Sequence, residues 1–190
     1  MNAVPGLKPL RYTYADYISW DDEARWELID GIAHAMSPAP SVAHQNIAGA
    51  LFALLREKLK GGPCRAFIAP LDVVLSETDV VQPDVFVVCN PAIIGERGVH
   101  GAPAWVAEVL SPATARKDMR EKKNLYERSG IGEYVVFDPL ERYVQRFVRG
   151  ENDAFAAMEV FDPGEELPLG FAPGECLPLW EIFESSPAAI

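Results

Sequence analysis

Apolar residues recur every three or four positions in the segment 41–60, and this spacing predicts an amphipathic α-helix. The helix would begin at Ser41, a favourable N-cap residue, and end before Gly61. The same spacing predicts a second long helix over residues 114–129, with Thr114 as its N-cap.

Short apolar runs bounded by proline, glycine and polar residues predict β-strands. Two of these runs, 25–29 and 32–36, are joined by Asp30 and Gly31, a pair typical of the turn of a β-hairpin. The other predicted strands lie at residues 64–68, 71–75, 85–89, 105–110, 133–137, 143–148 and 154–161.

This order of elements predicts a mixed α/β (α+β) fold with one central mixed β-sheet. Two long helices would flank the sheet and the N-terminal hairpin would precede it. The segment 162–190 is rich in proline and glycine, and we expect it to wrap around the core. Because no repeat or sharp change in composition marks a boundary, we expect one domain over residues 1–190 with its core at about 12–161.

Charged residues interrupt the apolar patterns, and such breaks are where functional residues are expected. Asp84 opens the run 85–89, which is apolar throughout and predicts a strand buried on both faces. Glu108 lies inside the apolar run 104–110, where a lone carboxylate is costly unless it is paired or binds a metal. Lys122 lies in the middle of the apolar face of the second helix, if residues advance by ~100° each.

Carboxylates on neighbouring strands, close to a buried lysine, predict a site for a divalent cation. Oxygen ligands suit Mg²⁺ or Mn²⁺, which also accept phosphate oxygens as ligands. The alternative for Asp84 and Glu108 is a structural ion pair with Lys122 or an arginine. Glu27 is a further candidate, and its alternative is the solvent-facing side of an edge hairpin.

Other helical residues are candidates for supporting roles at the same site. Asp118 and Tyr126 lie one turn before and one turn after Lys122 on the same helix face. His44 could reach the site from the first turn of its helix, although a surface or helix-start role is the commoner one. Basic residues on the opposite face of the second helix predict either a solvated surface or phosphate contacts. They are Arg116, Lys117, Arg120 and Lys123.

The composition restricts the function and the location. The net charge of −11 disfavours nonspecific binding to nucleic acids, and it is the main objection to a nuclease. Three widely spaced cysteines, Cys64, Cys89 and Cys176, suggest packing residues in a reducing cytoplasm and no disulfide framework. Residues 1–14 show no signal-peptide pattern and no apolar run reaches the ~18 residues of a membrane span, so we expect a cytoplasmic protein.

Several motifs of the chain recur in this order in one protein family. They are 26–31 (WELIDG), 82–85 (QPDV), 108–112 (EVLSP), Asp118 with Lys122, and 134–139 (YVVFDP). From about Tyr12 to Phe183 the chain resembles the Uma-type restriction endonucleases, a branch of the PD-(D/E)xK nuclease superfamily.

The resemblance implies a restriction-endonuclease-like core with Asp84, Glu108 and the Val109 carbonyl as metal ligands. It also implies that Glu27 belongs to the catalytic site. One position departs from the superfamily pattern, because Leu110 stands where a lysine is expected two residues after the second acidic ligand. The resemblance implies that this lysine has moved to the helix, where Lys122 stands.

We therefore expect a metal-dependent endonuclease that hydrolyses DNA phosphodiester bonds. Asp84 and Glu108 would hold Mg²⁺ or Mn²⁺, Lys122 would orient the attacking water, and Glu27 would bind metal or act as a base. The alternatives are a non-catalytic module that binds nucleic acid or protein, and a hydrolase of another phosphodiester. No helix-turn-helix or zinc module is recognisable, so relaxed sequence specificity is expected. A homodimer is expected from aromatic residues interpreted as exposed, such as Trp20 and Trp180.

Overall fold

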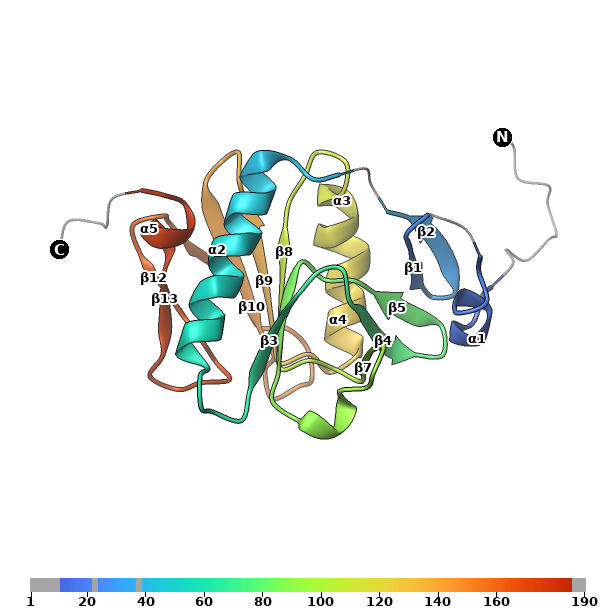
Figure 1. Ribbon diagram of the computed structural model, residues 1–190. Coiled ribbons are helices and arrows are strands. Elements are labelled where there is room, and N and C mark those ends of the chain that lie inside the picture. The colour runs from blue at the N-terminus through green and yellow to red at the C-terminus, as the bar shows by residue number, and fades with distance from the viewer. Residues whose placement is uncertain (1–10, 22–23, 37–38, 186–190) are drawn as a thin grey trace.

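A six-stranded mixed β-sheet forms the centre of the structure, a computed structural model that describes residues 11–21, 24–36 and 39–185 (Figure 1). Its strand order is β11-β10-β9-β8-β6-β3. β8 and β9 pair in parallel, and the other neighbouring strands pair antiparallel. The strands are β3 (Arg65–Ile68), β6 (Val85–Val88), β8 (Trp105–Val109), β9 (Glu133–Asp138), β10 (Tyr143–Val148) and β11 (Glu159–Phe161). The mixed sheet expected from the sequence is confirmed.

Helices cover both faces of this sheet (Figure 1). α2 (Val42–Lys58) packs on one face, and Ser41 caps it as predicted, since its hydroxyl accepts a hydrogen bond from the His44 N–H at 3.2 Å. The other face is covered by a helical segment made of α3 (Ala115–Lys117), a π-helical turn (Asp118–Lys122) and α4 (Lys123–Arg128).

Alternate residues of each central strand point to opposite faces of the sheet. In β8, Trp105, Ala107 and Val109 pack in the hydrophobic cluster that contains α2. Val106 packs in the second cluster, together with Leu125 of α4. The same alternation turns Glu108, the one carboxylate of β8, toward the helix on the α4 side.

The start of the second helix differs from the prediction. Thr114 makes no capping hydrogen bond through its side chain, because its backbone is already in the α-helical region. Its N–H instead donates to the Ser111 hydroxyl at 3.2 Å. The π-helical turn was also not predicted, since a local change from α to π geometry leaves no trace in the spacing of apolar residues.

A second, five-stranded sheet contains the N-terminal hairpin, which the sequence did not assign to a sheet of its own. Its order is β2-β1-β5-β4-β7. The strands are β1 (Trp26–Ile29), β2 (Ile32–Ala35), β4 (Asp72–Ser76), β5 (Asp79–Val81) and β7 (Gly98–His100). The hairpin turn is confirmed, with positive φ angles of 53° at Asp30 and 73° at Gly31. β5 and β7 were missed because three residues are too few to show a period.

The N-terminal helix α1 (Tyr14–Tyr17) lies beside the hairpin. Trp20 follows it and is partly buried rather than exposed, because its ring packs edge-on against Tyr12 at 5.2 Å and against Trp26 at 5.8 Å. Most of the segment 1–14, where no signal peptide was expected, lies outside the described residues.

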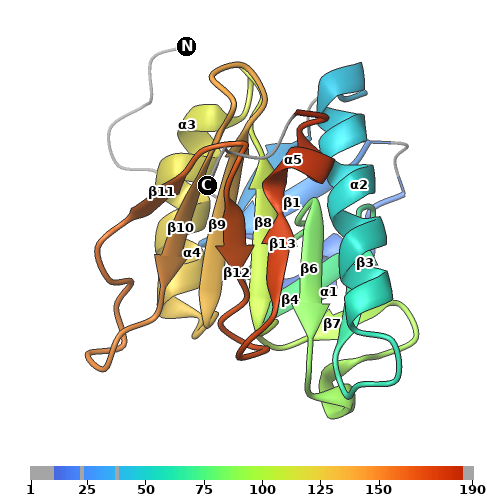
Figure 2. The ribbon, with the colours of Figure 1, turned by 90° about the vertical axis from the view of Figure 1, so that its left-hand side faces the viewer.

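The C-terminal segment packs beside α2, as Figure 2 shows, and this confirms the predicted wrap as far as residue 185. It contains β12 (Glu166–Pro168), β13 (Cys176–Pro178) and α5 (Leu179–Ile182), while a short 3-10 helix (Pro91–Ile93) precedes β7. The strand predicted over 154–161 is shorter and is limited to β11. No helix in the described part of the chain is long and apolar enough to cross a membrane.

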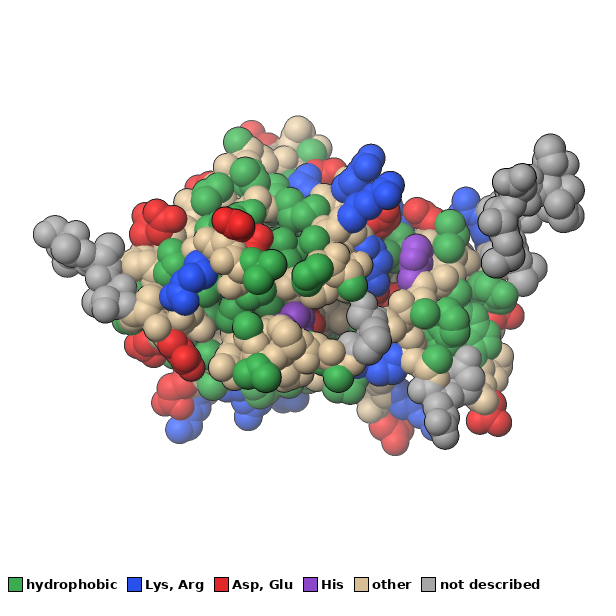
Figure 3. All heavy atoms as spheres, turned by 90° about the horizontal axis from the view of Figure 1, so that it is seen from above, with side chains coloured by type: hydrophobic (Ala, Val, Ile, Leu, Met, Phe, Trp, Pro, Cys, Tyr) green, Lys and Arg blue, Asp and Glu red, His purple; other side chains and the backbone are tan. Residues whose placement is uncertain are grey.

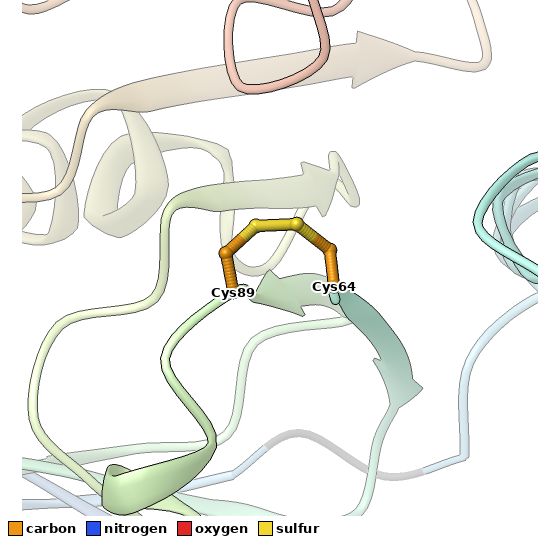
Figure 4. The surroundings of a disulfide bond; sticks show 2 residues. All are labelled: Cys64 and Cys89. Atoms are coloured by element: carbon orange, nitrogen blue, oxygen red, sulfur yellow. A yellow bond between two sulfur atoms is a disulfide. The ribbon is translucent and has the colours of Figure 1, made fainter. Parts of the chain in front are cut away.

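The interpretation of all cysteines as unpaired packing residues is wrong. Cys64 and Cys89 form a disulfide, with their Cα atoms 3.9 Å apart (Figure 4). The cause is the register of β3 and β6, in which Arg65 pairs with Val88, so that the next two residues along the strands are the cysteines. Their separation of 25 residues in the sequence concealed this pairing. Cys176 is free.

Candidate active site

Asp84 and Glu108 lie beside each other at one end of the six-stranded sheet. β6 and β8 pair antiparallel with Val85 opposite Ala107, so the next pair in this register is Asp84 and Glu108. Residues that oppose one another in such a pair direct their side chains to the same face of the sheet. The structure therefore brings together the two carboxylates that the sequence singled out.

Lys122 lies among the carboxylates and is itself buried. Its Nζ is 2.8 Å from Glu108 Oε1, 2.9 Å from Glu27 Oε1 and 3.8 Å from Asp118 Oδ1. The Tyr126 hydroxyl donates to the same Oε1 of Glu108 at 2.6 Å. Burial alone would lower the pKa of Lys122, but the carboxylates of Glu108 and Glu27 raise it well above its ordinary value. Lys122 is therefore an ammonium ion at neutral pH.

Glu27 is fully buried on β1 and lies between two lysines. Its Oε1 binds Lys122 and also accepts the Gln82 N–H at 3.2 Å, while its Oε2 is 2.6 Å from Lys117 Nζ. Burial alone would raise the pKa of Glu27, but Lys122 and Lys117 together lower it to about 2. The alternative of a solvent-facing position on an edge strand is wrong, because β1 lies between β2 and β5.

His44 reaches the site from the first turn of α2. Its Nε2 is 3.1 Å from Asp84 Oδ2, which also accepts the Val109 N–H at 2.8 Å. Burial lowers the pKa of His44, but the hydrogen bond to Asp84 outweighs this and the pKa is raised. The Nδ1 atom of His44 is buried and has no hydrogen-bond partner within the described part of the chain.

Burial has the opposite effect on the carboxylates nearest Lys122. It raises the pKa of Glu108 well above its ordinary value, and although Lys122 opposes this shift, the charge of Asp84 adds to it. Burial also raises the pKa of Asp118 against the opposing effect of Lys122. Both shifts favour the uncharged carboxyl group over the carboxylate.

A cleft of about 660 Å³ opens onto these side chains. Figure 3 looks down on this end of the molecule, where hydrophobic side chains cover much of the middle and Lys and Arg side chains gather beside them. Apolar residues such as Pro112 and the exposed Leu140 form part of the cleft wall. Its charged lining consists of Arg25, Glu27, His44, Asp84, Glu108, Lys117, Asp118 and Lys122.

The four basic residues of the second helix have different surroundings. Lys117 lines the cleft and binds Glu27, so its interpretation as part of a solvated face is wrong. Arg116 and Arg120 are exposed. Lys123 lies away from the cleft wall, with Nζ 4.9 Å above the Phe147 ring. The possibility of phosphate contacts is therefore strongest for Lys117.

Gln82 is a residue whose role the sequence did not reveal, although it stands in the motif 82–85. Its side-chain amide donates to Asp72 at 2.8 Å and its Oε1 accepts from Arg25 Nε at 3.1 Å. Since its backbone N–H also binds Glu27, Gln82 connects the second sheet to the site. The only signal was its position two residues before Asp84.

The oxygen atoms at the end of the sheet fit a divalent cation in their chemistry. Asp84, Glu108 and the Val109 carbonyl are ligands of the type that Mg²⁺ and Mn²⁺ prefer. Four carboxylates line the cleft together with the ammonium groups of Lys117 and Lys122 and the guanidinium group of Arg25, so the carboxylates outnumber these cations by one. No three His, Cys, Asp or Glu side chains among residues 11–21, 24–36 and 39–185 have metal-ligating geometry. The position of Lys122 between three of the carboxylates accounts for this.

Comparisons with known proteins agree with this architecture. A crystal structure titled as that of "a putative nuclease belonging to DUF820", from Anabaena variabilis, has a TM-score of 0.75 and 22% sequence identity to this chain. The match covers 90% of this chain and 97% of that one, and it shows that the fold is restriction-endonuclease-like.

The sequence comparisons identify a family. The uncharacterized protein slr1290 of Synechocystis is 32% identical over 114 residues, which make up 58% of this chain and 60% of that protein. The chain thus matches less than two thirds of that relative's length. Residues 14–179 match the family model Uma2, which is described as "Putative restriction endonuclease" and supports a nuclease function in general. The matched region covers most of the sequence, and the chain belongs to the Uma2 family.

Proposed function

We propose that this protein is an endonuclease that hydrolyses DNA phosphodiester bonds with Mg²⁺ or Mn²⁺. The observation that carries the proposal is the pair of adjacent carboxylates, Asp84 and Glu108, in an open cleft whose four carboxylates outnumber its three Lys and Arg side chains. A structural ion pair would balance its charges, whereas the surplus of carboxylates in this cleft favours the binding of a cation.

Asp84, Glu108 and the Val109 carbonyl would hold the cation, which withdraws charge from the phosphate under attack. Lys122 and Tyr126 both bind Glu108 Oε1, and these two hydrogen bonds fix the rotamer of that ligand. His44 and the Val109 N–H fix Asp84 in the same way. Three carboxylates enclose the Lys122 ammonium, so we assign to it the holding of Glu108 rather than the expected orientation of the attacking water.

The net charge of −11 is no obstacle at the cleft itself. The carboxylates of the lining exceed its Lys and Arg side chains by one, so one divalent cation would make the lining positive enough to accept a phosphate. Arg116 and Arg120 are exposed on the helix that forms one side of the cleft. DNA binding should accordingly be weak without the cation.

The test compares the protein with its Asp84→Ala variant on supercoiled plasmid and on single-stranded circular DNA, in Mn²⁺, Mg²⁺ or EDTA. We expect metal-dependent nicking that the variant loses by at least ~10³-fold, since several kcal/mol of transition-state stabilisation disappear with the cation. Mn²⁺ should also raise the melting temperature of the unaltered protein and not that of the variant.

The matched control is Lys58→Met, because Lys58 pairs with Glu175 at the far end of α2 and does not line the cleft. RNA and a nitrophenyl phosphodiester serve as competing substrates. If the protein cleaved only the small ester, its substrate would be a phosphodiester other than DNA. Absence of any cleavage, together with no Mn²⁺-dependent change in melting temperature, would overturn the proposal.

A further inference from the structure

Glu27 has contacts that suit neither a metal ligand nor a base. Both of its oxygens already bind ammonium groups, Oε1 that of Lys122 at 2.9 Å and Oε2 that of Lys117 at 2.6 Å. The Gln82 N–H occupies Oε1 further, and the carboxylate is fully buried on β1. Its surroundings are those of an anchor for two lysines.

The two lysines differ in what they can still bind. An ammonium group has three N–H donors. Lys122 faces Glu108, Glu27 and Asp118, and only 4% of its side chain is exposed. Lys117 makes an ion pair with Glu27 alone among the described residues, and 19% of its side chain is exposed in the cleft. Lys117 thus retains donors for a further anion in the cleft, whereas carboxylates enclose Lys122.

The π-helical turn explains why both lysines reach one carboxylate. In a regular α-helix, two residues five apart point about 140° away from each other, at ~100° per residue. The turn between them closes a hydrogen bond from the Lys123 N–H to the Asp118 carbonyl, five residues back. The Tyr134 hydroxyl donates to the same carbonyl at 3.1 Å and supports the turn. The wider turn brings Lys117 onto the face of Lys122.

We propose that Lys117 is the catalytic residue that contacts the scissile phosphate, and that Glu27 is a positioning residue that holds Lys117 at the cleft. This inference rests on the proposed nuclease function. Lys122 remains the buried counter-ion of Glu108. The Lys117 ammonium binds a non-bridging phosphate oxygen and stabilises the negative charge that grows there during attack.

The test measures cleavage kinetics of Lys117→Met beside Lys58→Met, each of which removes one lysine from a Lys–Glu pair. Lys117→Met leaves Glu27 bound to Lys122 and to the Gln82 N–H, so the fold should persist. We expect kcat/KM to fall by about 10²-fold in Lys117→Met, the size of a lost charge-assisted hydrogen bond. Lys58→Met should match the unaltered protein.

A binding measurement distinguishes a phosphate contact of Lys117 from a purely structural role. With Ca²⁺ in place of Mn²⁺, anisotropy of a labelled DNA duplex gives the dependence of affinity on salt. Lys117→Met should reduce the slope of log affinity against log salt by about 1, as the loss of one phosphate contact does. Lys117→Arg should restore the slope. Glu27→Gln should lower kcat but keep the slope, because the ammonium charge remains.

The outcomes distinguish this inference from the function on which it rests. If the unaltered protein cuts DNA and Lys117→Met matches Lys58→Met in both rate and salt slope, Lys117 is no phosphate contact and the inference is overturned while the nuclease stands. If Lys117→Met fails to fold, Lys117→Arg and Glu27→Gln decide by the same two readouts. If Asp84-dependent cleavage is absent altogether, both proposals fall.

Discussion

Two clusters of buried charge each include a glutamate of the six-stranded sheet, and they differ in how their charges are balanced. The site cluster consists of Glu27, Glu108, Asp118, Lys117 and Lys122. The Arg146 cluster consists of Glu133 on β9, Arg146 on β10 and Glu159 on β11. In the register of β8 and β9, Glu133 pairs with Trp105 and Val136 with Glu108, so the two clusters lie at opposite ends of the sheet.

The Arg146 cluster satisfies its own charges. Arg146 Nε is 2.6 Å from Glu133 Oε1, and the other oxygen of Glu133 accepts the Gly170 N–H at 2.8 Å. Glu159 is 53% exposed, so water compensates its charge. The site cluster, by contrast, holds three carboxylates against two ammonium groups and opens into a cleft beside Asp84. Both regions contain buried charge, whereas only the site cluster has an excess of carboxylates at a cleft.

The largest expected effect comes from removing the central cation of each cluster. Lys122→Met leaves Glu27, Glu108 and Asp118 without it, and we expect the free energy of unfolding to fall by about 3–5 kcal/mol. Arg146→Met should lose a comparable amount through Glu133. Mn²⁺ should restore part of the stability of Lys122→Met, because its carboxylates can take a cation in place of the ammonium. Urea unfolding with and without Mn²⁺ measures both effects.

The Lys122→Met and Arg146→Met variants should differ in how much Mn²⁺ stabilises them. Arg146→Met should gain no more from Mn²⁺ than the unaltered protein does, since Glu133 is buried beside a single remaining carboxylate. An equal gain in the stability of both variants with Mn²⁺ would show that the two clusters do not differ in their capacity for a cation.

Sequence reasoning could locate the site but not distinguish these clusters. Asp84, Glu108 and Lys122 broke apolar patterns, and the structure brings them together. Glu133 and Arg146 break the patterns of their strands equally, yet they were not singled out. Whether a buried charge is balanced depends on partners such as the Gly170 N–H, 37 residues from Glu133. Partners at such a distance are not visible in local spacing.

The fold was predictable where elements were long or had a strong turn signal. The segment 41–60 and the Asp30–Gly31 hairpin are of this kind. The three-residue strand β5 carries too little pattern to be recognised. The π-helical turn misled the assignment of Lys117, because the expected rotation of ~100° per residue does not hold across it.

The second-largest effect is a loss of stability at acidic pH, which we expect from the site cluster alone. The pKa of Glu27 is lowered from 4.5 to about 2, so its contribution to stability is present above pH 4.5 and is lost as the pH falls toward 2. Glu27→Gln cannot titrate. We expect the free energy of unfolding of the two proteins to differ by about 3 kcal/mol at neutral pH. Urea unfolding at successive pH values should show this difference closing between pH 4.5 and 2.

Glu108 and Asp118 titrate with the opposite sign, because burial raises their pKa values. They are present in both proteins, so their contribution largely cancels in the difference. Glu159→Gln, in the exposed part of the Arg146 cluster, is the matched control and should show no such closing. A difference that stays constant down to pH 2 would mean that the lysines do not stabilise the charge of Glu27.

The smallest effect separates stability from activity. Glu133→Gln keeps the shape of the side chain but removes the charge that faces Arg146, and we expect it to lose about 1–3 kcal/mol in the free energy of unfolding. Its cleavage of DNA should be unchanged, because Glu133 lies at the opposite end of the sheet from Glu108. Asp84→Asn should keep its free energy of unfolding and lose cleavage. An amide oxygen still accepts the Val109 N–H but carries no charge for a cation. Urea unfolding of both variants measures their stability, and plasmid nicking measures their cleavage activity. If Glu133→Gln lost cleavage at full stability, the balanced cluster would itself take part in function, and charge imbalance would no longer distinguish the site.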